Sequence, residues 1–308
     1  MSKATICIIT CRRPEGLKRL LEALILQQVS PETALDIIVV DNACEQRTAD
    51  VVTEIQTKTP YLIHYYEESE PGIVAARNKC VKQFLLTDSS FLFFIDDDEW
   101  PESNNWAQKI LDAQIKYQAD VISSHVISIG EKGTPEWATQ LLYGDNKLVE
   151  GQKISKYYTN NLLISRTVLE TVVPAFDSRF AMTGASDYHF SLKCSNLGYS
   201  AFYTDAPVVE EFPKSRATLA WFARRGYRSG VGFTRSHLFE DKIYKAIPFC
   251  LLMAGTRLIR GLISLIFGVV SFNKLRIMNG LFRLSSFAGS LSAFFGGQYQ
   301  EYKTIHGK

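Results

Sequence analysis

The sequence predicts an α/β fold in which a largely parallel sheet carries helices on both faces. The first 130 residues alternate short apolar runs with amphipathic helical patterns. The runs are apolar throughout, as in strands that are buried on both sides. Polar residues follow directly on three of these runs, at Thr10, Asp41 and Asp96. Because such sheets bind ligands at the carboxyl ends of their strands, one edge of the sheet is predicted to hold the functional site.

The elements succeed one another at short intervals. Strands are predicted at residues 5–10, 35–40, 61–65, 91–95 and 120–127. Helices are predicted at residues 14–25, 50–56, 73–86 and 106–117, and Pro14 opens the first of them. Residues 130–213 follow no regular pattern, after which a helix is predicted at residues 219–232.

Charge divides the chain into an acidic body and a basic tail. Residues 1–212 hold 19 Lys and Arg against 29 Asp and Glu, whereas residues 213–308 hold 15 against 3. A basic tail indicates an anionic partner, either a nucleic acid or a membrane. The apolar runs at residues 247–272 and 277–295 favour a membrane surface and no nucleic acid.

Neither apolar run is a clean transmembrane span. A spanning helix needs roughly 20 apolar residues, but Arg257 and Arg260 interrupt the first run and Arg283 the second. We expect residues 246–308 to form two membrane-lying or re-entrant helices, with a transmembrane hairpin and a soluble dimerisation bundle as alternatives. The six cysteines form no C-x-x-C pair and the start lacks a signal-peptide pattern, which indicates the cytoplasmic face of the membrane.

The strongest chemical signal is FLFFIDDDEW, in which three aspartates follow a buried strand. Carboxylates this close together repel one another unless a cation neutralises them. Oxygen ligands suit Mg²⁺ or Mn²⁺, which proteins often hold with one or two carboxylates plus substrate phosphates. The alternative is an acidic turn that caps the next helix. We expect Asp96, Asp97 and Asp98 to hold a divalent metal.

Other polar residues are expected at the same edge. Asp41 can accept a hydrogen bond from a base or a ribose, or it can form an Asx turn. Arg13, which follows Thr10, can face an anion at a helix start, or lie in a solvated turn. The stretch TCRRP lacks the glycines of a Rossmann turn or a P-loop. Arg77 can reach a phosphate or hold a metal-binding aspartate, or form a surface ion pair.

Two later segments complete the expected site. Asp187, in GASDYHF, is the best candidate for a general base because it comes from a different segment than the metal ligands; an N-cap is the alternative. Arg225 and Arg228 share a face of the predicted helix with Arg224 or with each other, and can clamp a pyrophosphate or form a solvated basic face.

Taken together, the ordered motifs resemble the inverting family 2 glycosyltransferases with the GT-A fold, notably bacterial exopolysaccharide enzymes of the succinoglycan-assembly type. The resemblance covers about residues 4–232. Its carriers are IITCRRP (8–14), VVDNA (39–43), EPGIVAARN (70–78), FIDDDEWP (94–101), GASDYHF (184–190) and WFARRGYRSG (221–230). It implies a glycosyltransferase domain at residues 1–245, with a nucleotide-sugar-binding half at 1–130 and an acceptor-binding half at 131–245.

The resemblance also implies roles. Asp41 would read the nucleobase beside Thr10, Asp98 with Asp96 would hold the metal, and Asp96 or Asp97 would lie near the ribose. Asp187 would be the catalytic base, with inversion at the anomeric carbon. The donor would be a nucleotide-diphosphate sugar, UDP-linked by default, and the acceptor a lipid-linked or other glycan. The family often has Glu-Asp where this chain has Ser186-Asp187, so the base is kept and the carboxylate before it is missing.

Three other functions fit parts of the sequence. A sugar nucleotidyltransferase would have a glycine-rich loop after the first strand, which this chain lacks. A haloacid-dehalogenase-like phosphatase would carry its aspartates on the first strand instead of the fourth. A membrane-bound nucleotide-sugar-binding protein without catalysis is distinguished by assaying donor hydrolysis or transfer with Mn²⁺ against a chelator.

Overall fold

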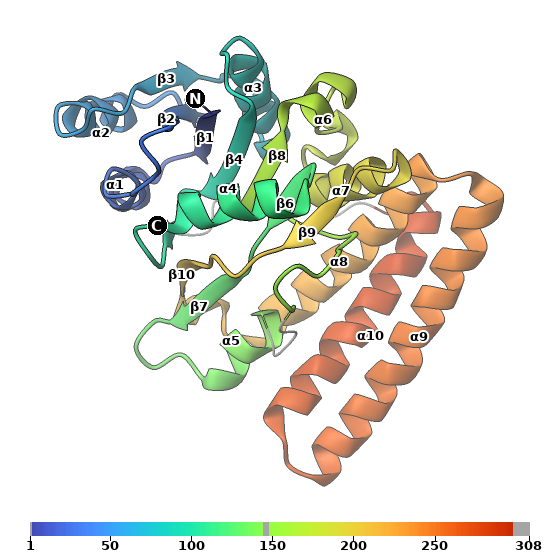
Figure 1. Cartoon of the computed structure of the whole chain (residues 1–308). Helices are drawn as coiled ribbons and strands as arrows, with labels where there is room; N and C mark the ends of the chain where they lie inside the picture. Colours follow the sequence, from blue (N-terminus) through green and yellow to red (C-terminus); the bar gives the residue numbers. More distant parts are fainter. Residues whose placement is uncertain (1, 144–147, 298–308) are drawn as a thin grey trace.

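The centre of the molecule is a seven-stranded sheet, seen in Figure 1 between two sets of helices. The computed structural model describes residues 2–143 and 148–297. The strands lie in the order β3-β2-β1-β4-β8-β6-β9. Their bounds are β1 Ser2–Thr10, β2 Thr33–Asp41, β3 Ile63–Glu67, β4 Phe91–Asp96, β6 Val121–Ser123, β8 Asn161–Ser165 and β9 Ala201–Tyr203.

The first four strands are parallel, but the sheet as a whole is mixed. β8 runs antiparallel to both β4 and β6. The sequence pattern predicts no strand at residues 161–165, because a five-residue apolar run fits a short helix equally well. The prediction of a largely parallel sheet is therefore correct for every strand of this sheet except β8, since β6 and β9 run in the same direction as β4.

A second, three-stranded sheet extends below the first in Figure 1. It consists of β5 Glu99–Pro101, β10 Val208–Phe212 and β7 Val126–Gly130, with β10 in the middle. The single strand predicted at residues 120–127 is thus two strands in different sheets. Ser124 and His125 separate them, and β7 pairs with β10 in parallel register.

Helices cover both faces of the central sheet, as predicted. The side chains of each strand alternate between the faces, so Ile6 and Ile8 pack on one side and Cys7 on the other. The first face is covered by α1 Pro14–Leu24, α2 Gln46–Gln56 and α4 Trp106–Tyr117. The second face is covered by α3 Ile73–Leu85, α6 Arg166–Thr171 and α7 Ser186–Asn196.

The remaining short elements lie outside these layers. They are helix α5 Glu136–Tyr143 and the 3₁₀ turns η1 Ser178–Phe180 and η2 Lys214–Arg216.

Three long helices form a separate layer at the carboxyl end of the chain. They are α8 Leu219–Glu240, α9 Ile243–Val270 and α10 Lys274–Phe294, and α10 lies between the other two (Figure 1). Glycines allow this close packing, because a side chain at Gly226 or Gly230 would collide with carbonyl groups of α10. The helix predicted at residues 219–232 therefore runs on to Glu240. The domain boundary expected at residue 245 falls inside α9.

Helix α9 is continuous through Arg257 and Arg260, which the sequence pattern treats as interruptions. By length and composition alone it is the one helix among the described residues that could cross a membrane. Only 17% of its most apolar window is buried against the protein. A long apolar surface of α9 therefore faces away from the fold.

Candidate functional site

The ends of three neighbouring strands bring the predicted polar residues together. In the β1–β2 pairing Thr10 lies opposite Asp41, and in the β1–β4 pairing Ile9 lies opposite Asp96. The turn that follows β4 carries Asp97 and Asp98 before β5 begins. Six of the predicted site residues, Thr10, Arg13, Asp41 and the three aspartates, therefore gather at one edge of the central sheet.

Asp97 is the buried member of the triplet. It accepts hydrogen bonds from Thr10 Oγ1 at 2.8 Å and from Arg13 Nη1 at 3.1 Å, and it is 6% exposed. Burial raises the pKa of Asp97 to about 6 although the charge of Arg13 opposes the rise. These contacts tie the loop before α1 to the end of β4, so Asp97 holds the site together.

Asp98 is the most open of the three carboxylates. Its side chain is 37% exposed, and Oδ2 accepts a hydrogen bond from Arg13 Nη1 at 2.8 Å. Its backbone carbonyl accepts a further bond from Arg19. Arg13 thus places positive charge beside the carboxylate that a substrate-bound cation would use.

Asp96 is half-buried at the point where β4 ends. Burial raises its pKa to about 7, the charge of Arg77 opposes this rise, and the neighbouring Asp98, Asp97 and Asp187 add to it. Glu99 is also buried, and burial raises its pKa well above the usual range. The site therefore holds more buried carboxylate than its positive charges offset, and a divalent cation would relieve this excess.

The residues present fit a metal that is completed by its substrate. Within residues 2–143 and 148–297, no three His, Cys, Asp or Glu side chains are grouped so as to enclose a metal ion. An open carboxylate at Asp98 with Asp96 behind it can supply one or two oxygen ligands. Mg²⁺ and Mn²⁺ sites that act on nucleotides are commonly completed by phosphate oxygens and water.

Asp41 is fully buried at the end of β2. Its Oδ1 accepts from the backbone N–H of Ala43 at 2.8 Å, and its Oδ2 from the N–H of Glu45 at 2.9 Å. Tyr65 Oη donates to Oδ2 at 3.0 Å. The Asx turn is therefore present, and Oδ1 still has capacity for one more hydrogen bond.

Arg77 joins the carboxylate edge to α7. It is 5% exposed, and its Nη1 donates to Ser186 Oγ at 3.1 Å. The surface ion pair considered for it is absent among the described residues, because Arg77 is buried and its favourable charge acts on Asp96. The motif around Arg77 therefore does not predict its contact with Ser186, which depends on how the chain folds.

Asp187 stands in the first turn of α7, half-buried, and faces the same set of charges. Its charge acts on Asp96 and on Tyr158, an exposed tyrosine. Gly184 and Ala185 precede the helix with positive φ values of 72° and 68°. This left-handed turn fixes the orientation of the first turn of α7, in which Asp187 accepts a hydrogen bond from the N–H of its neighbour, Tyr188.

Basic residues from η2 and α8 approach the edge from the other side. Arg216 is one of them, and the sequence pattern did not predict it. Burial lowers the pKa of Arg216, the charge of Asp98 opposes this shift, and the charges of Arg13 and Arg225 add to it. Arg225 also packs over the ring of Trp221 at 5.3 Å. Arg228 is half-buried one turn further along α8. The turn KSR before the Arg-rich helix was the available sequence signal for Arg216.

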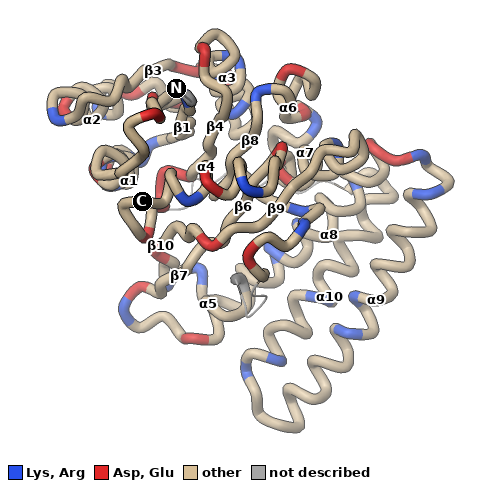
Figure 2. Tube along the Cα trace, viewed as in Figure 1, with Lys and Arg blue, Asp and Glu red and all other residues tan. Residues whose placement is uncertain are grey.

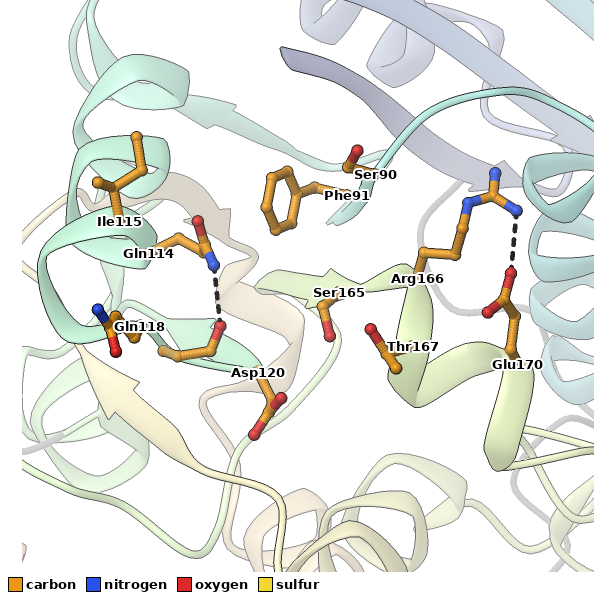
Figure 3. A pocket seen from close by; sticks show the side chains of 11 residues that line it. Ser90, Phe91, Gln114, Ile115, Gln118, Asp120, Ser165, Arg166, Thr167 and Glu170 are labelled. Atoms are coloured by element: carbon orange, nitrogen blue, oxygen red, sulfur yellow. Dashed lines mark hydrogen bonds and ion pairs between the residues drawn. The ribbon is translucent and has the colours of Figure 1, made fainter.

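A surface hollow of about 640 Å³ lies at the opposite end of β4, beside Phe91 (Figure 3). Its polar side chains are partly paired with one another and with the backbone. Gln114 Nε2 donates to the carbonyl of Ala119 at 3.2 Å, and Arg166 Nη1 lies 3.5 Å from Glu170 Oε1. The hollow is thus separate from the aspartate edge and contributes nothing to it.

Known proteins resemble this chain in sequence and in fold. The profile of the family described as Glycosyl transferase family 2 matches residues 5–173. The succinoglycan biosynthesis protein ExoM of Rhizobium meliloti is 29% identical over 242 residues, which cover 78% of this chain and 76% of that protein.

Two solved structures share the fold at low identity. The mannosyltransferase PcManGT from Pyrobaculum calidifontis, in complex with GDP-Man and Mn²⁺, has a TM-score of 0.65 and 16% identity over 96% of this chain and 88% of that one. The structure of residues 1–349 of S. aureus TarS in complex with UDP has a TM-score of 0.53 and 15% identity, over 100% of this chain and 95% of that one. The central sheet with its flanking helices is accordingly of the GT-A type.

Proposed function

Because this chain belongs to glycosyl transferase family 2, we propose that it transfers a sugar from a nucleotide-diphosphate sugar to a hydroxyl of a lipid-linked or other glycan acceptor, with inversion. Its glycosyltransferase class follows from the family, and the similarity to a succinoglycan biosynthesis protein favours polysaccharide or glycolipid assembly. The observation that carries the proposal is that the acidic edge after β4, at Asp96 and Asp98, lies within electrostatic reach of Asp187 in helix α7.

The donor is proposed to lie along the carboxyl edge of β1, β2 and β4. Asp41 offers its remaining acceptor capacity to the base, with Thr10 beside it, and Asp96 or Asp97 lies toward the ribose. UDP is the default nucleotide, since similar structures contain UDP or GDP-Man. Arg13, Arg225 and Arg228 would face the diphosphate, as guanidinium groups suit phosphate oxygens.

Mn²⁺ or Mg²⁺ would be held by Asp98 with Asp96. When bound, the cation would supply Lewis-acid stabilisation for the diphosphate leaving group. The chain's own contribution is electrostatic and positional. Arg77 offsets the charge of Asp96 from behind, and Arg13 fixes Asp97 and Asp98 relative to Thr10.

Asp187 is proposed as the base. It takes the proton from the acceptor hydroxyl as that oxygen attacks the anomeric carbon from the face opposite the diphosphate. The C–O bond to the leaving group breaks, the new glycosidic bond forms, and the anomeric configuration inverts. Ser186, in the place where the family often has Glu, is engaged by Arg77 in this chain and leaves Asp187 as the acidic residue of the pair.

A peripheral or monotopic position on the cytoplasmic face of the membrane is proposed for the helical layer. The outer face of α9 carries exposed leucine, isoleucine and phenylalanine side chains. If α9 and α10 spanned the bilayer, α8 packed along α10 would carry Arg224, Arg225 and Arg228 toward the hydrocarbon. Contact through the outer surface of the α9–α10 hairpin leaves these arginines in water.

The proposal is tested by replacing the base. Asp187→Asn keeps the size of the side chain but removes the proton acceptor, so sugar transfer is expected to fall by at least about 100-fold. Donor binding, measured as thermal stabilisation by UDP-sugars or GDP-sugars with Mn²⁺, should persist because those ligands bind the native state. Asp205→Asn is a matched control, since Asp205 is an exposed aspartate outside the site. Near-normal transfer by Asp187→Asn would remove Asp187 from the base role.

The metal is tested separately. Asp98→Ala is expected to abolish the additional stabilisation that Mn²⁺ gives in the presence of UDP, since it removes the exposed carboxylate of the site. Stabilisation that is equal in Asp98→Ala and in the unaltered chain would contradict the metal assignment.

A further inference from the structure

A shallow groove of about 470 Å³ lies on the surface of the hairpin formed by α9 and α10. Three arginines line it: Arg260 from α9, and Arg276 and Arg283 from α10. The residues from α9 recur at the spacing of one helical face, as do those from α10. Ile263 and Phe267 add apolar surface to the same groove. Guanidinium groups and apolar side chains therefore meet at one place on an otherwise apolar hairpin.

The positive charge of this groove has no acidic counterpart on the hairpin. Residues 242–297 hold seven Lys and Arg and no Asp or Glu. Figure 2 shows the same pattern, with Lys and Arg as the charged residues along the two helices. Arg283 is half-buried, and the positive charge of Arg260 acts on it unfavourably. Its one hydrogen bond within the described chain is from Nε to Asn279 Oδ1 at 2.8 Å.

Arg257, another arginine of the hairpin, contributes to the packing between helices. Arg257 turns toward α8, where its guanidinium lies 4.2 Å from the ring centre of Phe233 and donates to Ser290 Oγ. Among the described residues no aromatic ring packs on Arg260, Arg276 or Arg283, and the hydrogen bond of Arg283 to Asn279 stays within α10. Their charges are oriented to the surface groove and not to the packing between helices.

We propose that the Arg260–Arg276–Arg283 groove binds the phosphate of an anionic membrane lipid. Arginine forks match phosphate oxygens, and the adjoining Ile263 and Phe267 suit the start of the acyl chains. The occupant is a bulk membrane lipid and not the sugar acceptor, because α9 and α10 alone line the groove and no residue of the aspartate edge takes part. This inference rests on the membrane association in the proposed function and gives it a specific headgroup contact.

The test is binding of the full chain to vesicles without any sugar donor. Vesicles of phosphatidylcholine are compared with vesicles that also contain about 30 mol% phosphatidylglycerol. The variant Arg260→Gln/Arg276→Gln/Arg283→Gln is compared with Lys242→Gln/Lys245→Gln/Lys274→Gln, which removes the same formal charge from the same hairpin. We expect the arginine variant to lose at least about tenfold more affinity for the anionic vesicles than the lysine variant. Equal losses would mean general attraction and overturn the site.

A third variant protects the test against misfolding. Arg260→Lys/Arg276→Lys/Arg283→Lys keeps every charge but removes the planar forks. The site requires about a tenfold loss of anionic-vesicle binding in this variant, whereas unchanged binding would overturn it. Thermal stabilisation of the chain by millimolar inorganic phosphate, without binding to the anionic vesicles, would assign the groove to free phosphate and overturn the lipid. None of these measurements needs sugar transfer. A chain without transferase activity would therefore contradict the proposed function without changing the vesicle-binding result.

Discussion

Gly232 of α8 is predicted to position the candidate base, although it lies far from it in sequence. A Cβ built at Gly232 would stand 2.5 Å from Cβ of Ala185, the residue that caps α7 directly before Ser186 and Asp187. Carbon atoms in contact normally lie about 3.5–4.0 Å apart, so Gly232→Ala must move the cap by roughly 1 Å. The cap cannot yield by rotating a side chain, because the opposing atom is a Cβ and its backbone is held at φ 68°.

The magnitude follows from this displacement. Overpacking of this kind costs about 1–3 kcal/mol of stability. A shift of about 1 Å at a reacting group can lower the rate about 100-fold. Gly232→Ala is therefore expected to lower kcat by about two orders of magnitude while the KM for the donor, which binds at the edge of β1, β2 and β4, changes little. Steady-state kinetics with a saturating acceptor and urea denaturation measure the two effects.

Three variants separate positioning from general damage. Ala185→Gly removes the opposing Cβ and suits the left-handed backbone, so the pair Gly232→Ala/Ala185→Gly should recover most of kcat. Gly268→Ala meets the backbone nitrogen of Ile277 within the α9–α10 hairpin, and should destabilise the protein without lowering kcat of the folded fraction. Gly255→Ala meets no atom within 4 Å and should be neutral or slightly stabilising. A kcat for Gly232→Ala that is normal, or that stays low in the pair, would refute the reasoning.

Two further predictions concern the carboxylates. The folded-state pKa of Asp97 is raised to about 6, above the 3.8 of an unperturbed aspartate, so the native state binds this proton more tightly than the unfolded state does. The stability of the protein therefore falls by about 3 kcal/mol as the pH rises from roughly 4 to 7. Urea denaturation in EDTA should show that Asp97→Asn lacks this part of the pH dependence. Arg77→Met is expected to lower the free energy of unfolding by about 1–2 kcal/mol at neutral pH, because it removes the charge that favours the ionised form of Asp96. Arg77→Met/Asp96→Asn should recover much of that loss. Additive losses in this double-mutant cycle would show that the two side chains do not interact.

The strands that could be predicted from the sequence are those whose apolar runs are long and end in a polar residue. β1, β2 and β4 satisfy this, and parallel pairing then places Thr10, Asp41 and Asp96 at one edge. β8 is not predicted because its apolar run, NLLIS, is short. An antiparallel strand also needs no crossover helix before it, so the helical pattern gives no second signal. The break between β6 and β7 is not predicted either, since no glycine or proline marks the change of sheet.

The candidate site was predicted at the level of residue types but not of side-chain directions. Three consecutive aspartates identify the edge, yet only the fold shows that Asp97 turns inward to Thr10 while Asp98 stays open. The partner of Arg77 is separated from it by 109 positions, a distance at which no helical or strand period applies. Arg216 was missed for the same reason, since its relation to Asp98 depends on η2 folding back over the edge.

The packing of α8 connects the two proposals physically. One side of this helix meets α7 at Gly232 and Ala185, and the other meets α10 at Gly226 and Gly230. Because Gly226 and Gly230 lie against backbone carbonyls of α10, and Gly232 lies against the Cβ of Ala185, a shift of either neighbour is passed on to α8. A lipid that holds the α9–α10 hairpin at the membrane therefore also fixes the helix against which the base is positioned. On this reasoning, anionic vesicles should raise the kcat of the unaltered chain toward a soluble acceptor, and Arg260→Lys/Arg276→Lys/Arg283→Lys should remove that increase while leaving the rate without vesicles unchanged.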